Sequence, residues 1–169
     1  MLTIPTLQFS KQDVTKPCEN TTSEIYIKTT IPQLDQGKYL DASIRRSLAL
    51  FNIAENHPPE TWTHVYTDGS GTKAITDGGA GIIIQYPSGA TQTASSDTGK
   101  HCTHYRAETK ALKQAAILVK DSLETCSPSV FLTDALSLLE ALQTNKSPLL
   151  ATQIQERCNT CIVVLQWIL

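Results

Sequence analysis

The stretch His64-Val-Tyr-Thr-Asp-Gly-Ser70 constrains the fold of this chain more than any other. It begins with the β-prone residues Val65 and Tyr66 and turns acidic at Asp68, directly before a glycine. Such a run predicts a strand whose carboxylate can be reached by a ligand. Aspartate is rare in strands and is not normally buried without a partner. A simpler interpretation also stands at this point, in which Asp68 caps a turn, because Asp-Gly is a common turn signal.

Two further carboxylates lie at similar boundaries between elements. Glu108 falls on the first turns of a long helical pattern, and Asp134 directly follows the apolar run Val130–Thr133. Two neighbouring strands with a helix laid across them could bring these acids together with Asp68. Like charges held close repel one another, and in a dry site one of them takes up a proton unless a cation lies among them. Oxygen-only ligands favour a hard ion, Mg²⁺ or Mn²⁺, over zinc.

Four short motifs follow one another along the chain. They are Thr67-Asp68-Gly69-Ser70, Gly78-Gly79-Ala80-Gly81, Tyr105-Arg106-Ala107-Glu108 and Leu132-Thr133-Asp134-Ala135. Together they resemble the type 1 ribonuclease H domain, in the version carried by jockey-type non-LTR retrotransposon reverse transcriptases. The resemblance extends from Thr63 to Leu169, about two thirds of the chain. Each motif is weak alone, but the four in this order, with matching strand and helix context, make a strong signal.

The resemblance implies both a fold and a reaction. The fold is α/β, with a mixed five-stranded sheet in the order 3-2-1-4-5 and helices on its faces. The reaction is metal-dependent endonucleolytic hydrolysis of the RNA strand of an RNA–DNA hybrid, with two Mg²⁺ or Mn²⁺ ions about 4 Å apart at the scissile phosphate. Asp68, Glu108 and Asp134 are then the catalytic residues and the metal ligands, with Asp68 bridging the two ions. No small-molecule organic cofactor is expected.

The resemblance also indicates where the hybrid binds. Backbone groups at Gly69 and Ser70 are expected to contact 2′-hydroxyls in the shallow minor groove, the feature by which a protein tells RNA from DNA. His104 and Tyr105 occupy positions where the family often presents polar residues to the hybrid. For Tyr105 the alternative is core packing under the helix.

The apolar pattern of this part predicts alternating strands and helices. Strands are expected at 64–70, 80–86, 90–96, 129–133 and 161–169. One helix follows the expected N-cap Thr103, a second spans 135–143, and a third begins at Ser147-Pro148. Strands alternating with helices after an antiparallel start predict a mixed sheet with helices on its faces.

The chain is expected to divide into two parts. Residues 1–60 are predicted to form a connecting segment, partly irregular with one short helix, and residues 61–169 a ribonuclease H-like domain. By resemblance the first part matches the piece between the polymerase and nuclease parts of a retrotransposon polyprotein.

The helix predicted in the connecting segment has a clear start and one apolar face. Asp41 is the expected N-cap, and Ile44, Leu48 and Phe51 share a helical face that should lie on another surface. His57 follows that helix beside a proline pair and is expected to be solvated, because paired prolines are typical of a stiff linker.

Charge and hydrophobicity exclude some classes of protein. A formal net charge of −2 argues against a protein that binds nucleic acid by bulk positive charge, although a local basic strip combined with metal contacts stays possible. No apolar run approaches the length of a membrane span, and the N-terminus lacks the pattern of a signal peptide. We therefore expect a cytoplasmic or nuclear protein that is not secreted and has no membrane partner.

The cysteines agree with a reducing compartment. The chain has five of them, an odd number, and no secretory signal. Cys158 and Cys161 have the spacing of a redox pair or half a zinc site, but no second pair with that spacing is present. We expect two buried structural thiols.

The sequence departs from the family pattern after Trp167-Ile168. The family continues there with a loop bearing proline and histidine and a helix with a fourth carboxylate, and we expect the second metal position to be incomplete without them. The missing helix should also leave the last strand uncovered. Two alternatives to the active nuclease follow: a catalytically impaired remnant that binds only metal or nucleic acid, and an interaction module that pairs through the exposed strand Ile162–Leu169. The oligomeric state is left open.

Overall fold

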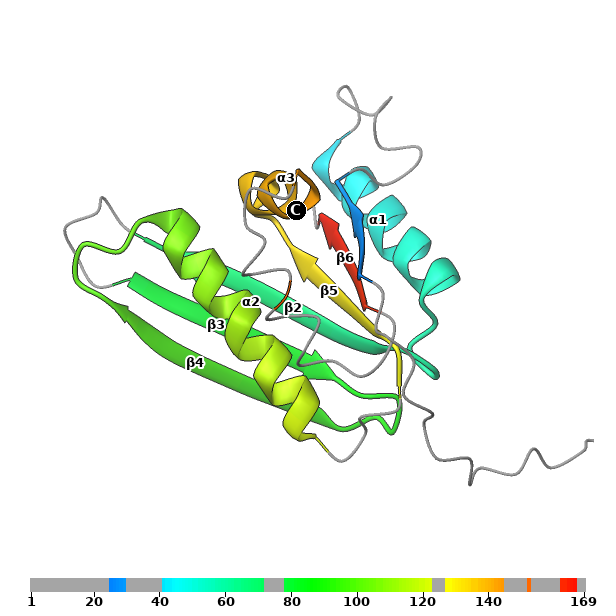
Figure 1. The fold of residues 1–169 in the computed structure, drawn as a ribbon. Coiled ribbons are helices and arrows are strands. Elements are labelled where there is room, and N and C mark those ends of the chain that lie inside the picture. The colour runs from blue at the N-terminus through cyan, green and yellow to red at the C-terminus, as the bar shows by residue number, and fades with distance from the viewer. Residues whose placement is uncertain are drawn as a thin grey trace, which may run out of the picture.

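The computed structural model describes residues 25–29, 41–71, 78–122, 127–144, 152 and 162–166. These residues form a mixed sheet with helices on both faces (Figure 1). In chain order the elements are β1 (Ile25–Lys28), α1 (Ala42–Asn56), β2 (Thr63–Ser70), β3 (Gly78–Gln85), β4 (Thr91–Gly99), α2 (His104–Asp121), β5 (Ser129–Thr133), α3 (Leu136–Gln143) and β6 (Ile162–Gln166). The α/β class predicted from the sequence is confirmed. The helix expected from Ser147 and the cysteines at 158 and 161 lie outside the described residues.

The sheet has six strands in the order β1-β6-β5-β2-β3-β4. The hairpins β2–β3 and β3–β4 are antiparallel, whereas β2–β5, β5–β6 and β6–β1 are parallel. The part from β4 to β6 follows the order expected from the resemblance. The expected count of five strands is wrong, because Ile25–Lys28 pairs with the outer side of β6.

This extra strand bears on one of the two alternatives, the interaction module. A strand can recruit another chain through its backbone only where its hydrogen-bonding edge is free. In this protein β6 is paired on both sides, with β5 along one edge and β1 along the other. Pairing with another chain through the backbone edges of Ile162–Gln166 is therefore contradicted, whereas residues 167–169 of the expected strand lie outside the described residues.

Side chains of β5 alternate between the two faces of the sheet, as they must in a strand. Phe131 belongs to the large core that α2 and α3 form on one face, together with Val65 of β2 and Leu138. Its neighbours Val130 and Leu132 pack instead with Ile53 of α1 in a separate cluster. Helices α2 and α3 thus cover one face, and α1 covers part of the other (Figure 1).

Helix α2 is built to lie close to the sheet. It begins at the expected N-cap, Thr103, whose hydroxyl accepts a hydrogen bond from the backbone N–H of Arg106. The small side chains of its buried stripe allow a short distance to the strands, and the stripe contains Ala107, Ala111, Leu112, Ala115, Ala116 and Val119. A close helix brings the side chains of its first turns within reach of β2.

Helix α1 has the predicted start but a different buried face. Asp41 is its N-cap and accepts a hydrogen bond from the N–H of Ser43, as expected. The predicted contact stripe is wrong for Ile44, which is 47% exposed, and for Phe51, which is 63% exposed. Its third residue, Leu48, is half-buried against Ala49, and Ile53 on another face is 3% exposed. Ile53 packs with Val130 and Leu132 of β5, so the helix contacts the sheet through the face that carries Ile53.

His57, at the C-terminal cap of α1, is buried rather than solvated. Its ring contacts the ring of Trp62 edge-on at 4.5 Å, and its carbonyl accepts a hydrogen bond of 2.7 Å from Nε2 of His64. Burial lowers the pKa of His57 to about 4. The expectation failed because the proline pair turns the chain back onto the sheet instead of extending it into solvent.

No helix in the described part of the chain is long and apolar enough to cross a membrane.

Candidate metal centre

Three carboxylates come together at the point where β5 ends and β2 continues. Asp68 lies on β2, Glu108 on α2, and Asp134 directly after β5, and one oxygen of each lies within 4.8 Å of the others. The strand register explains the meeting, because Thr67 of β2 pairs with Thr133, the last residue of β5. Asp68 and Asp134 are the residues that follow this pair. After the Thr67–Thr133 pair, β2 is no longer paired with β5. The side chain of Glu108, on α2, can therefore reach the carboxylates of Asp68 and Asp134 there.

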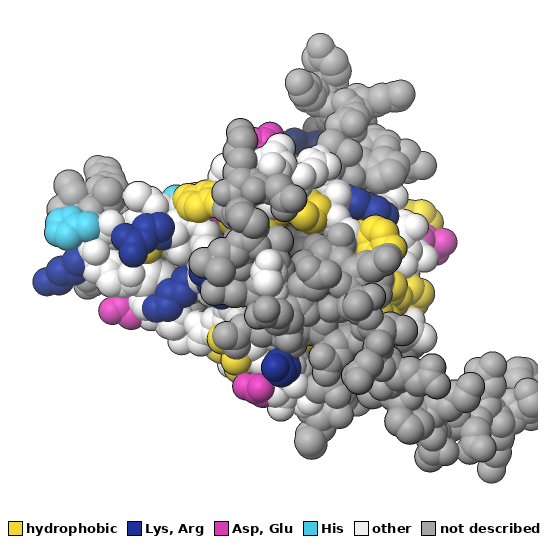
Figure 2. Space-filling model, in the orientation of Figure 1, with side chains coloured by type: hydrophobic (Ala, Val, Ile, Leu, Met, Phe, Trp, Pro, Cys, Tyr) yellow, Lys and Arg dark blue, Asp and Glu magenta, His cyan; other side chains and the backbone are white. Residues whose placement is uncertain are grey.

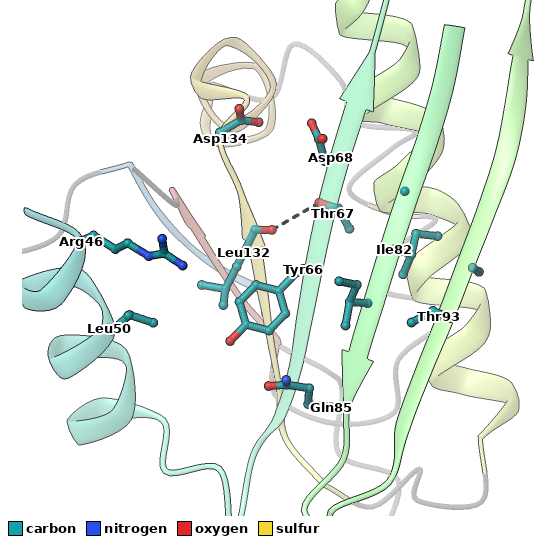
Figure 3. A pocket seen from close by; sticks show the side chains of 13 residues that line it. Arg46, Leu50, Tyr66, Thr67, Asp68, Ile82, Gln85, Thr93, Leu132 and Asp134 are labelled. Atoms are coloured by element: carbon teal, nitrogen blue, oxygen red, sulfur yellow. Dashed lines mark hydrogen bonds between the residues drawn. The ribbon is translucent and has the colours of Figure 1, made fainter. Parts of the chain in front are cut away.

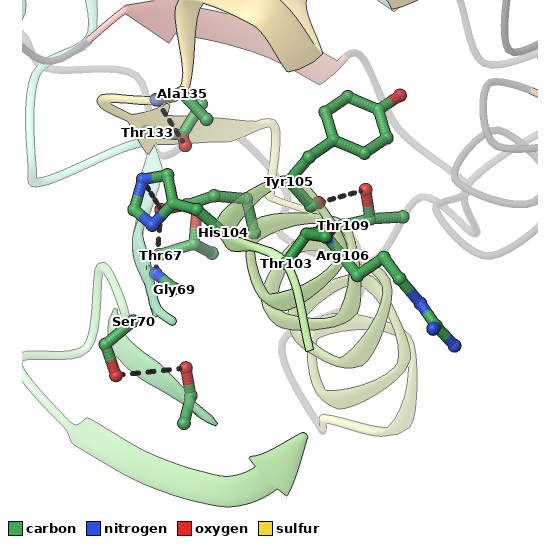
Figure 4. Close-up of polar contacts among 12 residues, drawn as sticks. Thr67, Gly69, Ser70, Thr103, His104, Tyr105, Arg106, Thr109, Thr133 and Ala135 are labelled. Atoms are coloured by element: carbon green, nitrogen blue, oxygen red, sulfur yellow. Dashed lines mark hydrogen bonds and ion pairs between the residues drawn. The ribbon is translucent and has the colours of Figure 1, made fainter. Parts of the chain in front are cut away.

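The turn that carries Asp134 is held by its own strand. Thr133 is buried, and its hydroxyl accepts a hydrogen bond of 3.3 Å from the N–H of Ala135, the N-cap of α3 (Figure 4). On the neighbouring strand, the hydroxyl of Thr67 donates to the carbonyl of Leu132 at 3.4 Å. Asp68 and Asp134 themselves are exposed. Their carboxylates can therefore be reached from solvent.

Glu108 is the buried member of the cluster, with no exposed surface. Its Oε1 accepts a hydrogen bond of 2.9 Å from the N–H of Gly69, whereas its buried Oε2 has no hydrogen-bond partner. Burial raises the pKa of Glu108 to about 7; the Gly69 N–H opposes this rise, and the negative charges of Asp134 and Asp68 add to it. A buried carboxylate oxygen without a partner is costly unless a cation or a proton is supplied.

Gly69 allows this arrangement because it has no side chain. A Cβ atom at this position would lie 2.3 Å from the backbone nitrogen of Glu108 and 2.6 Å from the carbonyl carbon of Ala107. Real Cβ contacts are not that short, so any other residue would push α2 away from β2. The glycine thereby sets the distance between the helix that carries Glu108 and the strand that carries Asp68. The hydrogen bond from its N–H to Glu108 gives it a positioning role.

Figure 4 shows the other residues expected to contact a hybrid, which lie on β2 and on the first turn of α2. The Nε2 atom of His104 lies 3.5 Å from Oε1 of Glu108, and its side chain is 61% exposed. Tyr105 is 37% exposed, so the alternative of core packing under the helix is wrong. Ser70 is exposed and its hydroxyl donates to the carbonyl of Gly79 at 3.5 Å. Substrate contacts by these residues and by Gly69 stay predictions.

A groove of about 790 Å³ begins at the acids and runs between α1 and the open face of the sheet (Figure 3). Its lining includes Asp68 and Asp134 at one end, Arg46 and Leu50 on the helix side, and Tyr66, Ile83, Gln85 and Thr93 among its strand residues. Arg46 and Leu50, on the α1 side of this groove, were not predicted from the sequence as part of the site. The spacing of Arg46 and Leu50 places both on one helical face, but no pattern in the sequence shows that α1 lies across β2 and β5.

Basic side chains gather on the opposite side of the sheet. Figure 2 shows Lys and Arg over α2 and the adjoining end of β4, and α2 itself carries Arg106, Lys110, Lys113 and Lys120. Although the net charge of the chain is −2, α2 carries a local basic strip, the possibility that the net charge alone did not exclude.

The cluster has the chemistry of a hard-cation site. It offers only carboxylate oxygens, the ligands that Mg²⁺ and Mn²⁺ prefer. The buried Oε2 of Glu108 is unpaired, and a bound cation would satisfy it while cancelling the repulsion among the three acids. Within the described residues this is the one group of three metal-ligating side chains so placed.

Comparison with known proteins supports the fold. No family model and no curated protein matches the chain. Among solved structures it is similar to RNase H1 from the halophilic archaeon Halobacterium salinarum NRC-1, with a TM-score of 0.52, 15% identity, and 62% of this chain and 84% of that one covered.

Two further RNase H structures are similar to the same degree. LC11-RNase H1, isolated from compost by a metagenomic approach, gives a TM-score of 0.51 at 21% identity, with 61% of this chain and 83% of that one covered. The N-terminal RNase H domain of Rv2228c from Mycobacterium tuberculosis gives 0.52 at 15% identity, with 64% and 82% covered. At this identity the likeness shows the fold, which is the ribonuclease H-like fold expected from the motifs.

Proposed function

We propose that this chain, which has a ribonuclease H-like fold, hydrolyses the RNA strand of RNA–DNA hybrids endonucleolytically with Mg²⁺ or Mn²⁺. The observation that carries the proposal is the convergence of Asp68, Glu108 and Asp134 within 4.8 Å, with one buried carboxylate oxygen unpaired. The similarity to three RNase H structures agrees with it. The motif resemblance quoted above adds a retroelement origin to the proposal.

The chain's own residues would hold the cation and present it to a phosphate. A hard divalent ion in such a site activates water and stabilises the charge that develops on the phosphate oxygens. Asp68 and Asp134 are exposed at the end of the groove, so they face the side from which a strand would enter. Glu108 is fixed from behind by Gly69 and by the packing of α2, and it needs little rearrangement to act as a ligand.

Recognition of RNA is assigned to the polar groups beside the acids. Ser70 and His104 are exposed next to the cluster, and either can form hydrogen bonds with a 2′-hydroxyl, which both donates and accepts. Tyr105 presents part of its ring at the same end of α2. Gly69 is proposed to contribute in two ways: its N–H holds the carboxylate of Glu108, and its backbone lies beside Ser70 in β2, where the hybrid is proposed to bind.

The test is cleavage of a labelled RNA–DNA hybrid in Mg²⁺, compared with DNA duplex and with single-stranded RNA of the same sequence. We expect cutting within the RNA strand of the hybrid alone. Asp68→Asn should lower the rate by roughly a thousandfold, because several kcal/mol of metal-dependent stabilisation is lost. Asp97→Asn is the matched control, since Asp97 is an exposed acid of β4 outside the cluster.

The same experiment separates the remaining alternative. The described residues bring three acids to the cluster, so a domain that binds metal or hybrid without cutting it is the second candidate. Tight hybrid binding with no cleavage in either Mg²⁺ or Mn²⁺ would favour that candidate. Absence of hybrid cleavage, of hybrid binding and of Mg²⁺ or Mn²⁺ binding would refute both candidates.

A further inference from the structure

We propose that Arg46 of α1 binds a backbone phosphate of the nucleic acid whose scissile bond lies at the three acids. This inference rests on the function proposed above and adds α1 to the substrate site. Arg46 and Asp134 line the same groove, Arg46 from the helix and Asp134 from the end of β5 (Figure 3). The groove thus has a candidate cation site at one end and a guanidinium along one wall.

The side chain of Arg46 is available for a ligand. It is exposed, and Figure 3 shows it extending from α1 toward Leu132 and the strands. Within the described ranges its guanidinium has neither an ion pair nor a hydrogen bond. Among the described residues, the ion pair at the acids joins His104 to Glu108 and does not involve Arg46. Arg46 therefore lines the groove without neutralising the acids directly.

Charge explains why a polyanion suits this arrangement. A divalent cation among the acids balances two of their three negative charges, and Arg46 contributes a second positive group on the wall. A guanidinium binds phosphate oxygens in a bidentate way and stays charged at any pH at which proteins are folded. A nucleic-acid strand carries a phosphate at every nucleotide, so one strand can offer a phosphate to both groups.

The lining between them is uncharged and suits the rest of the nucleotide. Ile83 is 45% exposed there, and Tyr66 adds an aromatic ring, so apolar parts of sugar or base can lie on them. Gln85 and Thr93 supply an amide and a hydroxyl that can both donate and accept hydrogen bonds. Because the chain's net charge is −2, a phosphate contact of this kind matters more than it would in a strongly basic protein.

The experiment compares Arg46→Gln with Lys28→Gln, which removes the same charge from an exposed residue of β1 outside the groove lining and outside the basic strip of α2. Hybrid binding is measured by fluorescence anisotropy in Mg²⁺ over a series of salt concentrations, in chains that also carry Asp68→Asn to prevent cutting. We expect Arg46→Gln to weaken binding about tenfold and to reduce the salt slope by about one. Arg46→Lys should keep the salt slope and restore part of the affinity, since it keeps the charge.

A second readout uses the chain with Asp68 intact. There Arg46→Gln should raise KM about tenfold with a smaller effect on kcat, because Arg46 lies away from the bond that breaks. Circular dichroism and thermal unfolding should match the parent chain, since the side chain is exposed. Equal affinities, salt slopes and KM values for Arg46→Gln and Lys28→Gln would overturn the inference while leaving the nuclease intact. Failure of the parent chain to bind or cut hybrid would instead overturn the proposed function, and this inference with it.

Discussion

The N–H of Gly69 and the carboxylate of Glu108 form a hydrogen bond of 2.9 Å that joins the strand of Asp68 to the helix behind it. The bond is buried, and it leaves the second carboxylate oxygen unpaired. One interaction thus fixes the direction of Glu108 while keeping one of its oxygens for a ligand. Because α2 rests directly on the Gly69 backbone, the same glycine controls both the hydrogen bond and the spacing between the two elements.

Replacing Gly69 by alanine should therefore separate α2 from β2. The new Cβ would meet backbone atoms of Ala107 and Glu108 at 2.6 and 2.3 Å, and backbone cannot move aside as a flexible side chain can. We expect the free energy of unfolding to fall by about 2–3 kcal/mol, within the range for overpacking, as measured by urea denaturation. Gly81→Ala is the matched control, because its Cβ would lie 3.8 Å from its nearest neighbour and should change stability by less than about 0.5 kcal/mol. Equal effects of the two variants would show that the close contact is unimportant.

The buried Glu108 should make the metal-free protein less stable as pH rises. Its pKa is near 7 in the folded chain and near 4.5 when unfolded, so the folded state holds the proton more tightly. The stability that Glu108 contributes is fully present below pH 4.5 and falls as pH rises toward 7. Above pH 7 it no longer changes, and the total loss in the free energy of unfolding is about 3 kcal/mol at most. His57, whose pKa is lowered to about 4, gains stability over a similar pH range and opposes this trend in both chains. The loss is therefore measured as the difference in free energy of unfolding between the parent chain and Glu108→Gln, in EDTA at several pH values. A difference between the two that does not change with pH would contradict the raised pKa.

A divalent cation should reverse that destabilisation. Binding to the folded state alone stabilises it by RT ln(1 + [L]/Kd), about 2.7 kcal/mol at a hundred times Kd. We expect Mg²⁺ to raise the melting temperature in a concentration-dependent way, and EDTA to remove the effect. The stabilisation should be lost in Asp134→Asn and kept in Asp97→Asn, an acid outside the cluster. It should also grow with pH up to about 7, because Glu108 must lose its proton to act as a ligand.

The acids could be predicted from sequence because the chemistry of each lies in its own short segment. A β-prone run ending in Asp68, a capped helix bearing Glu108, and an apolar strand followed by Asp134 are local patterns, and the structure brings all three together. Helix α2 and its N-cap Thr103 were predictable for the same reason. The burial of Glu108 and the role of Gly69 were not, because both depend on how closely α2 approaches β2.

The contribution of the N-terminal segment could not be predicted, since it depends on contacts between segments distant in sequence. Nothing within Ile25–Lys28 indicates that it pairs with β6, which lies near the other end of the chain. The apolar residues of α1 fall on more than one face, and two residues of the more obvious stripe, Ile44 and Phe51, are exposed. The groove that includes Arg46 follows from this packing, so it too appears only in the structure. The division of the chain at about residue 60 stays a prediction.

The packing of α1 on the sheet can be tested by comparing its two apolar faces. Ile53 is 3% exposed and contacts Val130 and Leu132, whereas Phe51 is 63% exposed. Ile53→Ala should lower the free energy of unfolding by about 2–4 kcal/mol, because it removes buried methyl groups and leaves a cavity. Phe51→Ala, a larger truncation on the same helix, should cost less than about 0.5 kcal/mol. If α1 lay on its other stripe, the order of these two values in urea denaturation would be reversed, and the groove wall that carries Arg46 would no longer face the acids.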